Sequence, residues 1–357
     1  MEITILPLPG ESKKSGNIDE SALGFGKIFT DRMLLVEWKS DRGWFDARIK
    51  PYEPFVLDPS SLVFHYAQEI FEGLKAYKWA DGTITLFRPE MNARRFNLSA
   101  DRLCMPRIPE EFFVESIMRL VKMEKDWIPT TEGTSLYIRP AMIAVEPVLG
   151  VKSSDHFYYF VILSPVGAYY ASGFNPVKIL VEDRYVRATP GGTGEAKTGG
   201  NYASSLIAGV EAKKKGFAQV LWLDGVHHRY VEEVGAMNMF FAYEDCVVTA
   251  PLAGSILNGV TRDSVICLAD SLGFRVEERP IEINQLVADI KEGTVKEAFG
   301  SGTAAVITPV GTLGFKGESL TVGDGGVGSL TRKLYDTLTG IQYGRIPDTF
   351  GWLRKIA

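Results

Sequence analysis

The sequence has few cysteines and few histidines, and this scarcity narrows the metal and redox chemistry that it can support. Of its 357 residues, 3 are cysteine and 4 are histidine. Cys104, Cys246 and Cys267 lie far apart without a Cys-x-x-Cys spacing, and the histidines form no pair at the spacing of a helical zinc motif. We therefore expect no metal site and a reducing compartment, the cytoplasm.

Long apolar runs and a large excess of one charge are also missing. No stretch reaches the ~18 apolar residues of a membrane-spanning helix, and residues 1–10 lack the positive and then apolar pattern of an export signal. The 39 Lys and Arg residues against 44 Asp and Glu residues give a formal net charge of −5, spread along the chain. Neither a membrane nor a nucleic acid is therefore an expected partner.

Length and composition indicate an ordinary folded protein with two domains. A chain of 357 residues exceeds the ~250 to 300 residues at which a single hydrophobic core stops growing. The hydrophobic share of 45% and the charged share of 23% are close to globular averages. We expect a smaller first domain over 1–165, a connection over 166–176, which ends in Asn-Pro, and a larger second domain over 177–357.

Helical and strand patterns are mixed in both halves, which predicts a fold of the α+β or α/β class. In the first half, helices are expected at 89–103 and 110–127. Strands there are expected at 34–38, 83–87, 136–145 and 157–163. In the second half we expect strands at 177–181, 219–223 and 229–234, and helices at 201–215 and 262–272.

A glycine-rich loop around Lys197 is the most informative segment. From Gly191 to Tyr202 it holds five glycines and leads into a predicted helix, so its backbone can approach a bulky ligand closely. A phosphate-binding P-loop would need glycine directly before the lysine, where Ala196 stands. Two interpretations stay open from this segment alone. Lys197 is either a solvated loop lysine or an amine that forms Schiff bases, which must be neutral for part of each cycle.

A carboxylate suited to a ring cofactor is present on a predicted strand. Glu232 and Glu233 are neighbours within 229–234, so their side chains point to opposite faces and one of them can face inward. A buried carboxylate beneath a pyridine nitrogen keeps the nitrogen protonated and makes the ring an electron sink. The alternative is that both glutamates lie exposed on an edge strand.

Three further features could bind a phosphate group. Residues 257–263 place a glycine and a potential Thr261 cap before a predicted helix, whose N–H groups can grip an anion. Residues 300–305 form a small-residue loop that offers the Thr303 hydroxyl. Arg95, on the predicted helix 89–103, would supply bidentate charge. Each feature has an ordinary alternative, namely a plain helix cap, a turn or a surface arginine.

Motifs along nearly the whole chain resemble the branched-chain aminotransferases, which are fold-type IV pyridoxal-phosphate enzymes. The motifs are Phe25–Asp31, His65–Tyr77, Phe87–Pro89, Tyr137–Pro140, Glu146–Val151, Lys197–Tyr202, Glu233–Asn238 and Gly300–Ala304. The resemblance implies a two-domain fold with pyridoxal 5′-phosphate between the domains. It also implies reversible amino transfer from L-leucine, L-isoleucine or L-valine to 2-oxoglutarate, by a ping-pong reaction through pyridoxamine phosphate, in a homodimer with shared active sites.

The resemblance also implies a role for each candidate residue. Lys197 would be the Schiff-base lysine and the proton shuttle at the substrate's Cα. The cofactor would further be bound by Arg95, Val260, Thr261 and Thr303 at the phosphate, Tyr202 at the phenolic oxygen, Glu233 at the ring nitrogen and Leu257 against the ring. The substrate pocket would consist of Phe25, Tyr137, Arg139, Ala304 and, from the neighbouring subunit, Tyr66 and Val151.

The pocket so assembled makes physical sense, because it must accept an apolar branched side chain and then the carboxylate of glutamate. The aromatic walls suit the apolar branched side chain. Arg139 and the tyrosine hydroxyls suit the glutamate carboxylate. Two departures from animal members limit what is carried over. Ala236 replaces a threonine near the cofactor, and Ala305 and Thr308 replace a redox-active Cys-x-x-Cys pair.

Two other functions remain open from the sequence. Other fold-type IV enzymes, the D-amino-acid aminotransferases and the aminodeoxychorismate lyases, use the same lysine, although the stretch Glu72–Tyr77 and the chain length are more similar to the branched-chain group. A non-catalytic module that binds pyridoxal phosphate is the second alternative. It is distinguished by whether leucine with 2-oxoglutarate bleaches the visible band of the purified protein.

Overall fold

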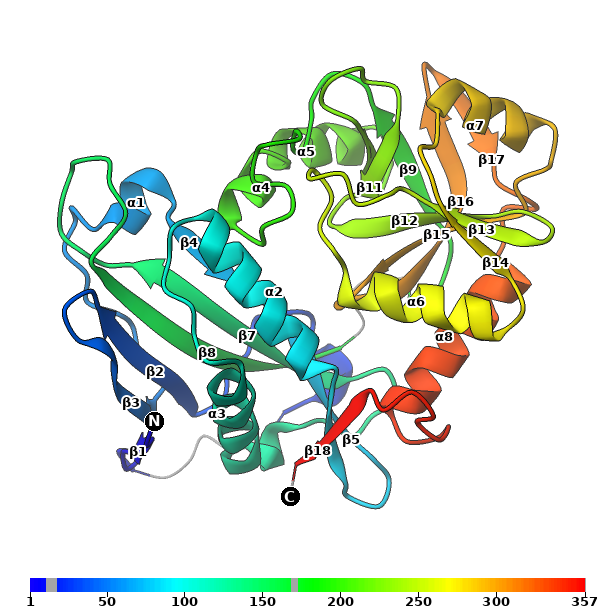
Figure 1. Cartoon of the computed structure of the whole chain (residues 1–357). Helices are drawn as coiled ribbons and strands as arrows, with labels where there is room; N and C mark the ends of the chain where they lie inside the picture. Colours follow the sequence, from blue (N-terminus) through cyan, green and yellow to red (C-terminus); the bar gives the residue numbers. More distant parts are fainter. Residues whose placement is uncertain (11–17, 168–172, 357) are drawn as a thin grey trace. The chain divides into compact units, whose positions relative to one another are not determined.

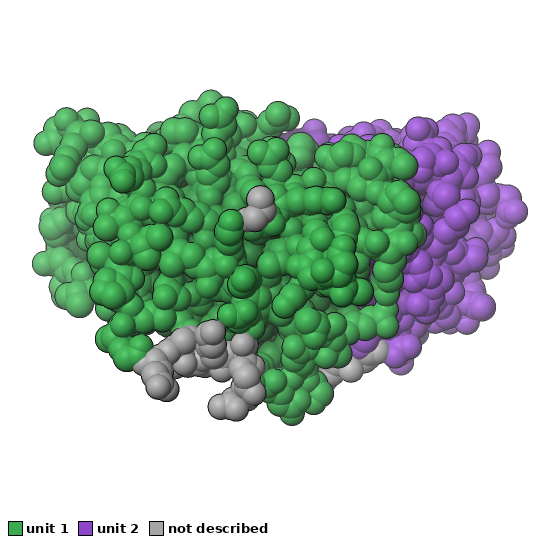
Figure 2. All heavy atoms as spheres, turned by 90° about the horizontal axis from the view of Figure 1, so that it is seen from below, with its two compact units in different colours: residues 1–169, 196–199, 341–357 green, residues 170–195, 200–340 purple. Residues whose placement is uncertain are grey.

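The computed structural model describes residues 1–10, 18–167 and 173–356, and the chain divides into two compact units (Figure 2). Unit 1 consists of Met1–Tyr169, Ala196–Gly199 and Ile341–Ala357, and unit 2 consists of Tyr170–Glu195 and Gly200–Gly340. Each unit combines a β-sheet with α-helices (Figure 1). The mixed fold class expected from the sequence is therefore confirmed.

Unit 1 is built on a mainly antiparallel sheet. Its strands are β1 (Thr4–Ile5), β2 (Arg32–Lys39), β3 (Gly43–Pro51), β4 (Glu69–Phe71), β5 (Leu74–Lys78), β6 (Ile84–Phe87), β7 (Ser135–Ala144), β8 (His156–Val166) and β18 (Leu353–Ile356). They follow the order β1-β3-β2-β8-β7-β5-β6-β18, with β4 paired to β7. In this order β1 and β3 run parallel.

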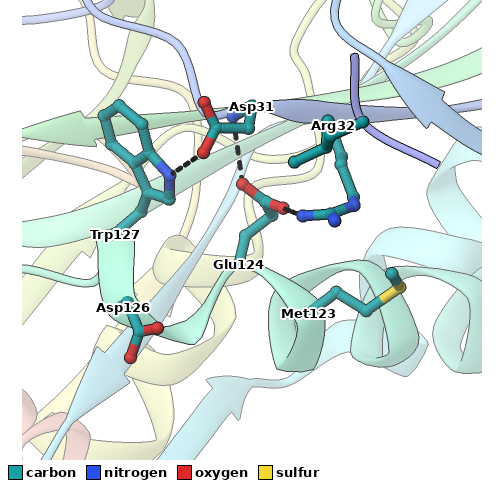
Figure 3. Close-up of a pocket in the computed structure, with 7 residues that line it drawn as sticks. Asp31, Arg32, Met123, Glu124, Asp126 and Trp127 are labelled. Carbon is teal, nitrogen blue, oxygen red and sulfur yellow. Dashed lines mark hydrogen bonds and ion pairs between the residues drawn. The ribbon is translucent and has the colours of Figure 1, made fainter. Parts of the chain in front are cut away.

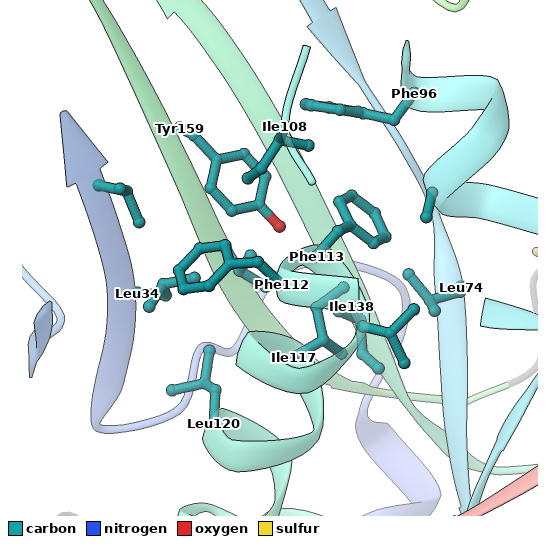
Figure 4. Close-up of a cluster of buried hydrophobic side chains, with 14 of the residues drawn as sticks. Leu34, Leu74, Phe96, Ile108, Phe112, Phe113, Ile117, Leu120, Ile138 and Tyr159 are labelled. Carbon is teal, nitrogen blue, oxygen red and sulfur yellow. The ribbon is translucent and has the colours of Figure 1, made fainter. Parts of the chain in front are cut away.

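One face of this sheet is apolar and is covered by helices. The helical elements of unit 1 are α1 (Leu62–Tyr66), α2 (Pro89–Arg102), α3 (Glu110–Met123) and the 3-10 turns Glu20–Ala22 and Lys125–Trp127. Phe113, Ile117 and Leu120 recur on one side of α3 at helical spacing and are fully buried in the cluster that holds Leu34 and Ile138 (Figure 4). Because side chains alternate along a strand, the neighbours of Ile138 point to the opposite face.

The sheet of unit 2 closes on itself. Its strands are β9 (Val177–Glu182), β10 (Gln219–Leu223), β11 (Val231–Val234), β12 (Met237–Ala242), β13 (Cys246–Thr249), β14 (Arg275–Glu278), β15 (Glu297–Gly302), β16 (Val306–Phe315) and β17 (Glu318–Thr321). The pairing of β11 with β12 joins the two ends of the path β11-β10-β9-β16-β15-β12. Strand β11 thus has a neighbour on both sides, which removes the edge-strand alternative for its glutamates.

Helices accompany the strands in this part of the chain. They are α4 (Gly199–Ala203), α5 (Leu206–Lys214), α6 (Val260–Ser271), α7 (Ile283–Lys291) and α8 (Ser329–Gln342). Ala208 and Ala212 on α5 form a buried cluster with Val220 and Trp222 of β10. The main core of unit 2 gathers apolar residues from strands β9 to β13, from strands β15 to β17 and from α7.

Most predicted elements are confirmed within a few residues, but the helix expected at 201–215 is wrong in its middle. Two helices, α4 and α5, stand in its place, separated at Ser204 and Ser205. The Ser204 hydroxyl donates to the Asn201 carbonyl (3.1 Å), and the Ser205 hydroxyl donates to the Tyr202 carbonyl (2.7 Å). These bonds compete with the helical ladder and interrupt it. The helix expected from residue 262 already begins at Val260.

The predicted domain boundaries differ from the observed units at the carboxyl end. Residues 341–357 belong to unit 1, where β18 pairs with β6 from Leu353 opposite Phe87 to Ile356 opposite Ile84. Residues 196–199 also belong to unit 1, which makes it the larger unit, the reverse of the expectation. The predicted connection at 166–176 includes residues 168–172, which lie outside the described residues.

Candidate functional site

Lys197 lies in a firmly held segment of unit 1 and is half-buried. Its backbone N–H donates to Ser99 Oγ on α2 (2.8 Å), and its carbonyl accepts from the Phe71 N–H on β4 (3.0 Å). The Nζ atom lies 4.9 Å from the centre of the Phe71 ring, a cation–π distance. These contacts do not fit the alternative of a freely solvated loop lysine.

Arg95 forms a buried ion pair with Glu72, a partner that sequence reasoning missed. Arg95 Nε and Nη2 lie 2.7 Å and 2.8 Å from the two carboxylate oxygens, and Asn92 donates to the same carboxylate at 2.8 Å. Burial raises the pKa of Glu72, but Arg95 and Lys197 more than offset this and keep the pKa below its ordinary value. The alternative that Arg95 is a surface residue is wrong, because its side chain is 8% exposed.

Three of the predicted pocket residues come together in unit 1. The rings of Phe25 and Tyr137 meet edge to face at 4.9 Å between centroids. Arg139 Nη2 donates to the Tyr137 hydroxyl (3.1 Å), and the guanidinium lies 4.6 Å from the Phe71 ring centre. A Cβ at Gly73 would overlap the Tyr137 hydroxyl, so glycine is needed there. The cluster offers aromatic walls and a cation on one face of β7.

Tyr66 and Val151 lie apart on an exposed apolar surface of unit 1. Tyr66, the last residue of α1, is 41% exposed and donates its hydroxyl to the Leu149 carbonyl (2.5 Å). Val151 is 84% exposed, Leu149 63% and Phe64 60%. Exposed apolar side chains gathered on one surface are typical of a region that meets another protein, and the bond between Tyr66 and Leu149 brings two of these residues together.

Glu233 is the centre of a buried polar network in unit 2. Its carboxylate lies 2.7 Å from Arg187 Nε and accepts from Asn238 Nδ2 (3.2 Å). The same Asn238 amide donates to the Leu257 carbonyl (2.9 Å), so Glu233 is linked to the predicted ring-packing residue. Arg187 also donates to the Ser255 carbonyl (2.9 Å). Sequence reasoning missed Arg187, because nothing local marks it as a partner of Glu233.

Glu232 is buried as well, in a different setting from its neighbour. Ser255 donates its hydroxyl to one carboxyl oxygen, and the other oxygen has no hydrogen-bond partner among the described residues. Burial raises the pKa of Glu232 above its ordinary value, although the Ser255 hydroxyl and the charge of Arg187 act in the opposite direction. We therefore expect Glu232 to hold a proton more readily than an exposed glutamate.

The predicted anion-binding segments of unit 2 are helix and strand ends. Val260 and Thr261 are the first residues of α6. The N-cap residue of this helix is Gly259, not Thr261 as expected. Glycine has no side chain that could bond to the N–H groups at the start of the helix. A Cβ at Gly259 would overlap Asn238 Oδ1. Thr303 and Ala304 form the turn between β15 and β16, and Tyr202 lies half-buried on α4.

A small cavity in unit 1 contains none of the predicted site residues (Figure 3). Arg32 Nη1 donates to Glu124 (2.8 Å), Glu124 accepts from the Asp31 N–H (3.0 Å), and Trp127 Nε1 donates to Asp31 (3.1 Å). These bonds tie β2 to the end of α3. Across the described ranges, no group of His, Cys, Asp or Glu is placed to hold a metal ion, and no helix is both long and apolar enough to cross a membrane.

Comparison with known proteins gives matches over most of the chain. The profile of the family described as amino-transferase class IV matches residues 69–313. Branched-chain-amino-acid aminotransferase 2 of Bacillus subtilis (strain 168) is 53% identical over 346 residues, 97% of this chain and 95% of that protein. The crystal structure of the Escherichia coli branched-chain amino acid aminotransferase has a TM-score of 0.73 at 27% identity and covers 90% of this chain and 99% of that one.

A second solved structure is the branched-chain amino acid aminotransferase of Thermobaculum terrenum in its PLP-form. It has a TM-score of 0.72 at 25% identity and covers 90% of this chain and 98% of that one. The likeness therefore extends over nearly the whole chain in sequence and over most of it in structure.

Proposed function

The chain belongs to the class IV amino-transferase family, and from this membership we propose that it is a branched-chain amino-acid aminotransferase. It transfers the amino group of L-leucine, L-isoleucine or L-valine reversibly to 2-oxoglutarate, which gives L-glutamate and the branched 2-oxo acid. The observation that carries the proposal is the 53% identity to an enzyme of that name over 97% of the chain.

The cofactor that we propose is pyridoxal 5′-phosphate, and the residues present fit it. The family comparison points to it, since the solved Thermobaculum terrenum relative is in its PLP-form. Within this chain, Lys197 offers an amine on a fixed backbone, Glu233 a buried carboxylate, and α6 an N-terminus whose cap residue is glycine. When bound, the cofactor supplies a ring that takes up the negative charge created when the substrate's Cα loses its proton.

Lys197 is the catalytic residue in this proposal. Its Nζ carries the cofactor covalently and moves the proton at the substrate's Cα, which requires the amine to be neutral at that moment. Arg139 lies against the same Phe71 ring as Lys197.

Glu233 keeps the ring nitrogen protonated, and its ion pair with Arg187 keeps Glu233 itself charged and oriented. Tyr202 donates to the phenolic oxygen, and Leu257 packs against the ring. The phosphate is bound by Arg95, by Thr303 and by the N–H groups of Val260 and Thr261, where the dipole of α6 favours negative charge.

The substrate pocket is formed by Phe25, Tyr137, Arg139 and Ala304 of one subunit. We propose that Tyr66 of the partner subunit and Val151 of the partner subunit complete it in a homodimer. The exposed apolar surface on which these two residues lie supports this assembly. The apolar side chain of a leucine, isoleucine or valine substrate then contacts the aromatic walls of the pocket. When glutamate is the substrate, its side-chain carboxylate contacts Arg139 and the Tyr137 hydroxyl.

A panel of amino acids and 2-oxo acids tests the function. The purified protein, loaded with pyridoxal phosphate, is expected to lose its visible band with L-leucine, L-isoleucine or L-valine and to regain it with 2-oxoglutarate. A response to D-alanine instead would favour a D-amino-acid aminotransferase. Release of pyruvate from aminodeoxychorismate would favour the lyase, and no response to any of these compounds would favour a binding module.

A further inference from the structure

Both backbone and side-chain hydrogen bonds hold the segment that carries Lys197 along strand β4. The residue after it, Thr198, is buried and donates its hydroxyl to the Glu69 carbonyl (2.7 Å). Together with the bond from the Phe71 N–H to the Lys197 carbonyl (3.0 Å), this fixes the segment at both ends of β4. All of these residues belong to unit 1.

The Glu69 side chain turns onto the next residue of the same segment. Its carboxyl group accepts a hydrogen bond from the N–H of Gly199, the first residue of α4. A Cβ at Gly199 would overlap Glu69 Oε1, so only glycine lets the carboxyl group approach this closely. Burial raises the pKa of Glu69, while the Gly199 N–H and Arg139 favour its charged form.

Glu69 and Phe71 point to the same face of β4, because they are two residues apart, and Ile70 between them is buried in the core. On that face, the Phe71 ring contacts two cations, Lys197 Nζ at 4.9 Å and the Arg139 guanidinium at 4.6 Å. Two positive groups against one ring repel each other. The Glu69 carboxyl group interacts electrostatically with one of them, Arg139.

We propose that Glu69 is a positioning residue for Lys197: its carboxyl group holds Gly199 and thereby the backbone from which the lysine extends, and it offsets the charge of Arg139 beside the same ring. The inference rests on the role proposed for Lys197. An amine that forms a covalent bond and transfers a proton must be held close to its working geometry, and this depends on the residues behind it.

The test compares Glu69→Ala with Glu69→Gln, which keeps an oxygen for the Gly199 N–H but removes the charge. The first readout is the rate at which the apoprotein captures pyridoxal phosphate at Lys197. This rate is measured from the increase in the visible absorption band of the bound cofactor. Glu69→Ala should slow capture and lower kcat by roughly 10-fold to 100-fold, the scale of a small misplacement of a reacting group. Glu69→Gln should restore the capture rate only in part, because it keeps the contact with the Gly199 N–H but loses the charge beside Arg139, and KM for leucine should change little in either variant.

Glu20→Ala is the matched control, because Glu20 is also a unit 1 carboxylate that accepts backbone N–H bonds, from Thr130 and Thr131. It should lower the melting temperature without changing capture. Equal capture rates in Glu69→Ala and Glu20→Ala would overturn the proposal. Should Glu69→Ala fail to fold, Gly199→Ala tests the same contact from the other side and should slow capture in the same way.

The outcomes also separate this inference from the proposed function. A wild-type protein that captures the cofactor at Lys197 but does not transaminate leucine would refute the function and leave the positioning role intact. A wild-type protein that transaminates leucine while Glu69→Ala captures the cofactor at the normal rate would refute the positioning role alone.

Discussion

Single residues carry the chemistry of this chain, and two of them depend on buried ion pairs. Glu233 pairs with Arg187, and Arg95 pairs with Glu72, with every member largely buried. A charge taken out of water is costly unless a partner and further hydrogen bonds satisfy it. These pairs therefore hold their members in a fixed place and charge state, which a site for a charged cofactor requires.

Replacement of Lys197 by alanine should remove turnover and covalent attachment of the cofactor together. One amine performs both tasks, and Lys213 and Lys214 lie exposed on α5, far along the chain from β4. Reduction of the loaded wild-type protein with borohydride, followed by peptide mass analysis, should place the pyridoxyl label on the peptide with Lys197. The label should be absent in Lys197→Ala and unchanged in Lys213→Ala. A label on another lysine would contradict the assignment.

Glu233→Gln should slow proton removal from the substrate on the order of 10²-fold, because a neutral amide does not keep a ring nitrogen protonated. Glu232→Gln is the matched control from the same strand. Since the Glu232 side chain points to the opposite face of the strand from Glu233, its replacement should change the rate little. Single-turnover kinetics with leucine measure both variants, and a larger loss in Glu232→Gln would reverse the assignment.

The sequence indicated candidate residues for covalent or charged contacts with a ligand, but not the residues that contact these candidates in the structure. Lys197 stands out because glycines surround it, whereas the choice of Glu233 over its neighbour Glu232 came from the family resemblance. Arg187 and Glu72 have no such signal, since each lies outside the strands and helices and meets a partner that is distant in the sequence. Ion pairs between residues distant in sequence depend on tertiary geometry, which local patterns do not encode.

At the scale of elements, helix periodicity was sufficient for α2 and α3, but the equally long α8 was not predicted and the break between α4 and α5 was missed. The helix α3 has apolar residues at regular spacing, and its predicted start at residue 110 is confirmed. The break between α4 and α5 depends on two serine side chains that bond back to carbonyls three residues earlier. The preference of serine for such bonds is weak by itself. The sequence pattern alone therefore does not show whether the helix continues or is interrupted at these residues.

Ile117→Ala should destabilise unit 1 by about 2 to 5 kcal/mol, the usual cost of a cavity left by a buried aliphatic side chain. Ile117 is fully buried between α3 and the sheet. Urea denaturation followed by circular dichroism measures the free energy of unfolding. Glu115→Ala on the exposed side of the same helix should change it by less than about 0.5 kcal/mol. Equal effects would mean that α3 does not pack as described.

At the scale of the whole molecule, the sequence predicted two parts but not how the chain is shared between them. Composition shifts mark the middle of the chain, yet β18 returns to pair with β6 in unit 1. Its four residues, Leu353–Ile356, carry no distinctive pattern. Whether a carboxyl-terminal strand pairs with the first sheet depends on which edge strand of that sheet is unpaired. This is known only once the rest of the chain has folded.

The exposed apolar surface of unit 1 leads to a prediction about assembly. Leu149→Asp places a charge on that surface, where the side chain is 63% exposed. In an isolated chain, an exposed substitution of this kind changes stability by less than about 0.5 kcal/mol. In a homodimer, a buried unpaired carboxylate at the interface would favour dissociation. Because the partner's Tyr66 and the partner's Val151 would then be lost from the pocket, activity should fall and should recover at high protein concentration.

Val56→Asp is the matched control, because Val56 is an apolar residue of unit 1 with 97% exposure outside this surface. Analytical ultracentrifugation should find a dimer for the wild type and for Val56→Asp, and a lighter species for Leu149→Asp at the same concentration. Activity should follow the dimer fraction across a dilution series, because in the proposed homodimer each pocket takes two residues from its partner. A wild-type protein that sediments as a monomer and keeps its full specific activity on dilution would show that one chain forms a complete site by itself.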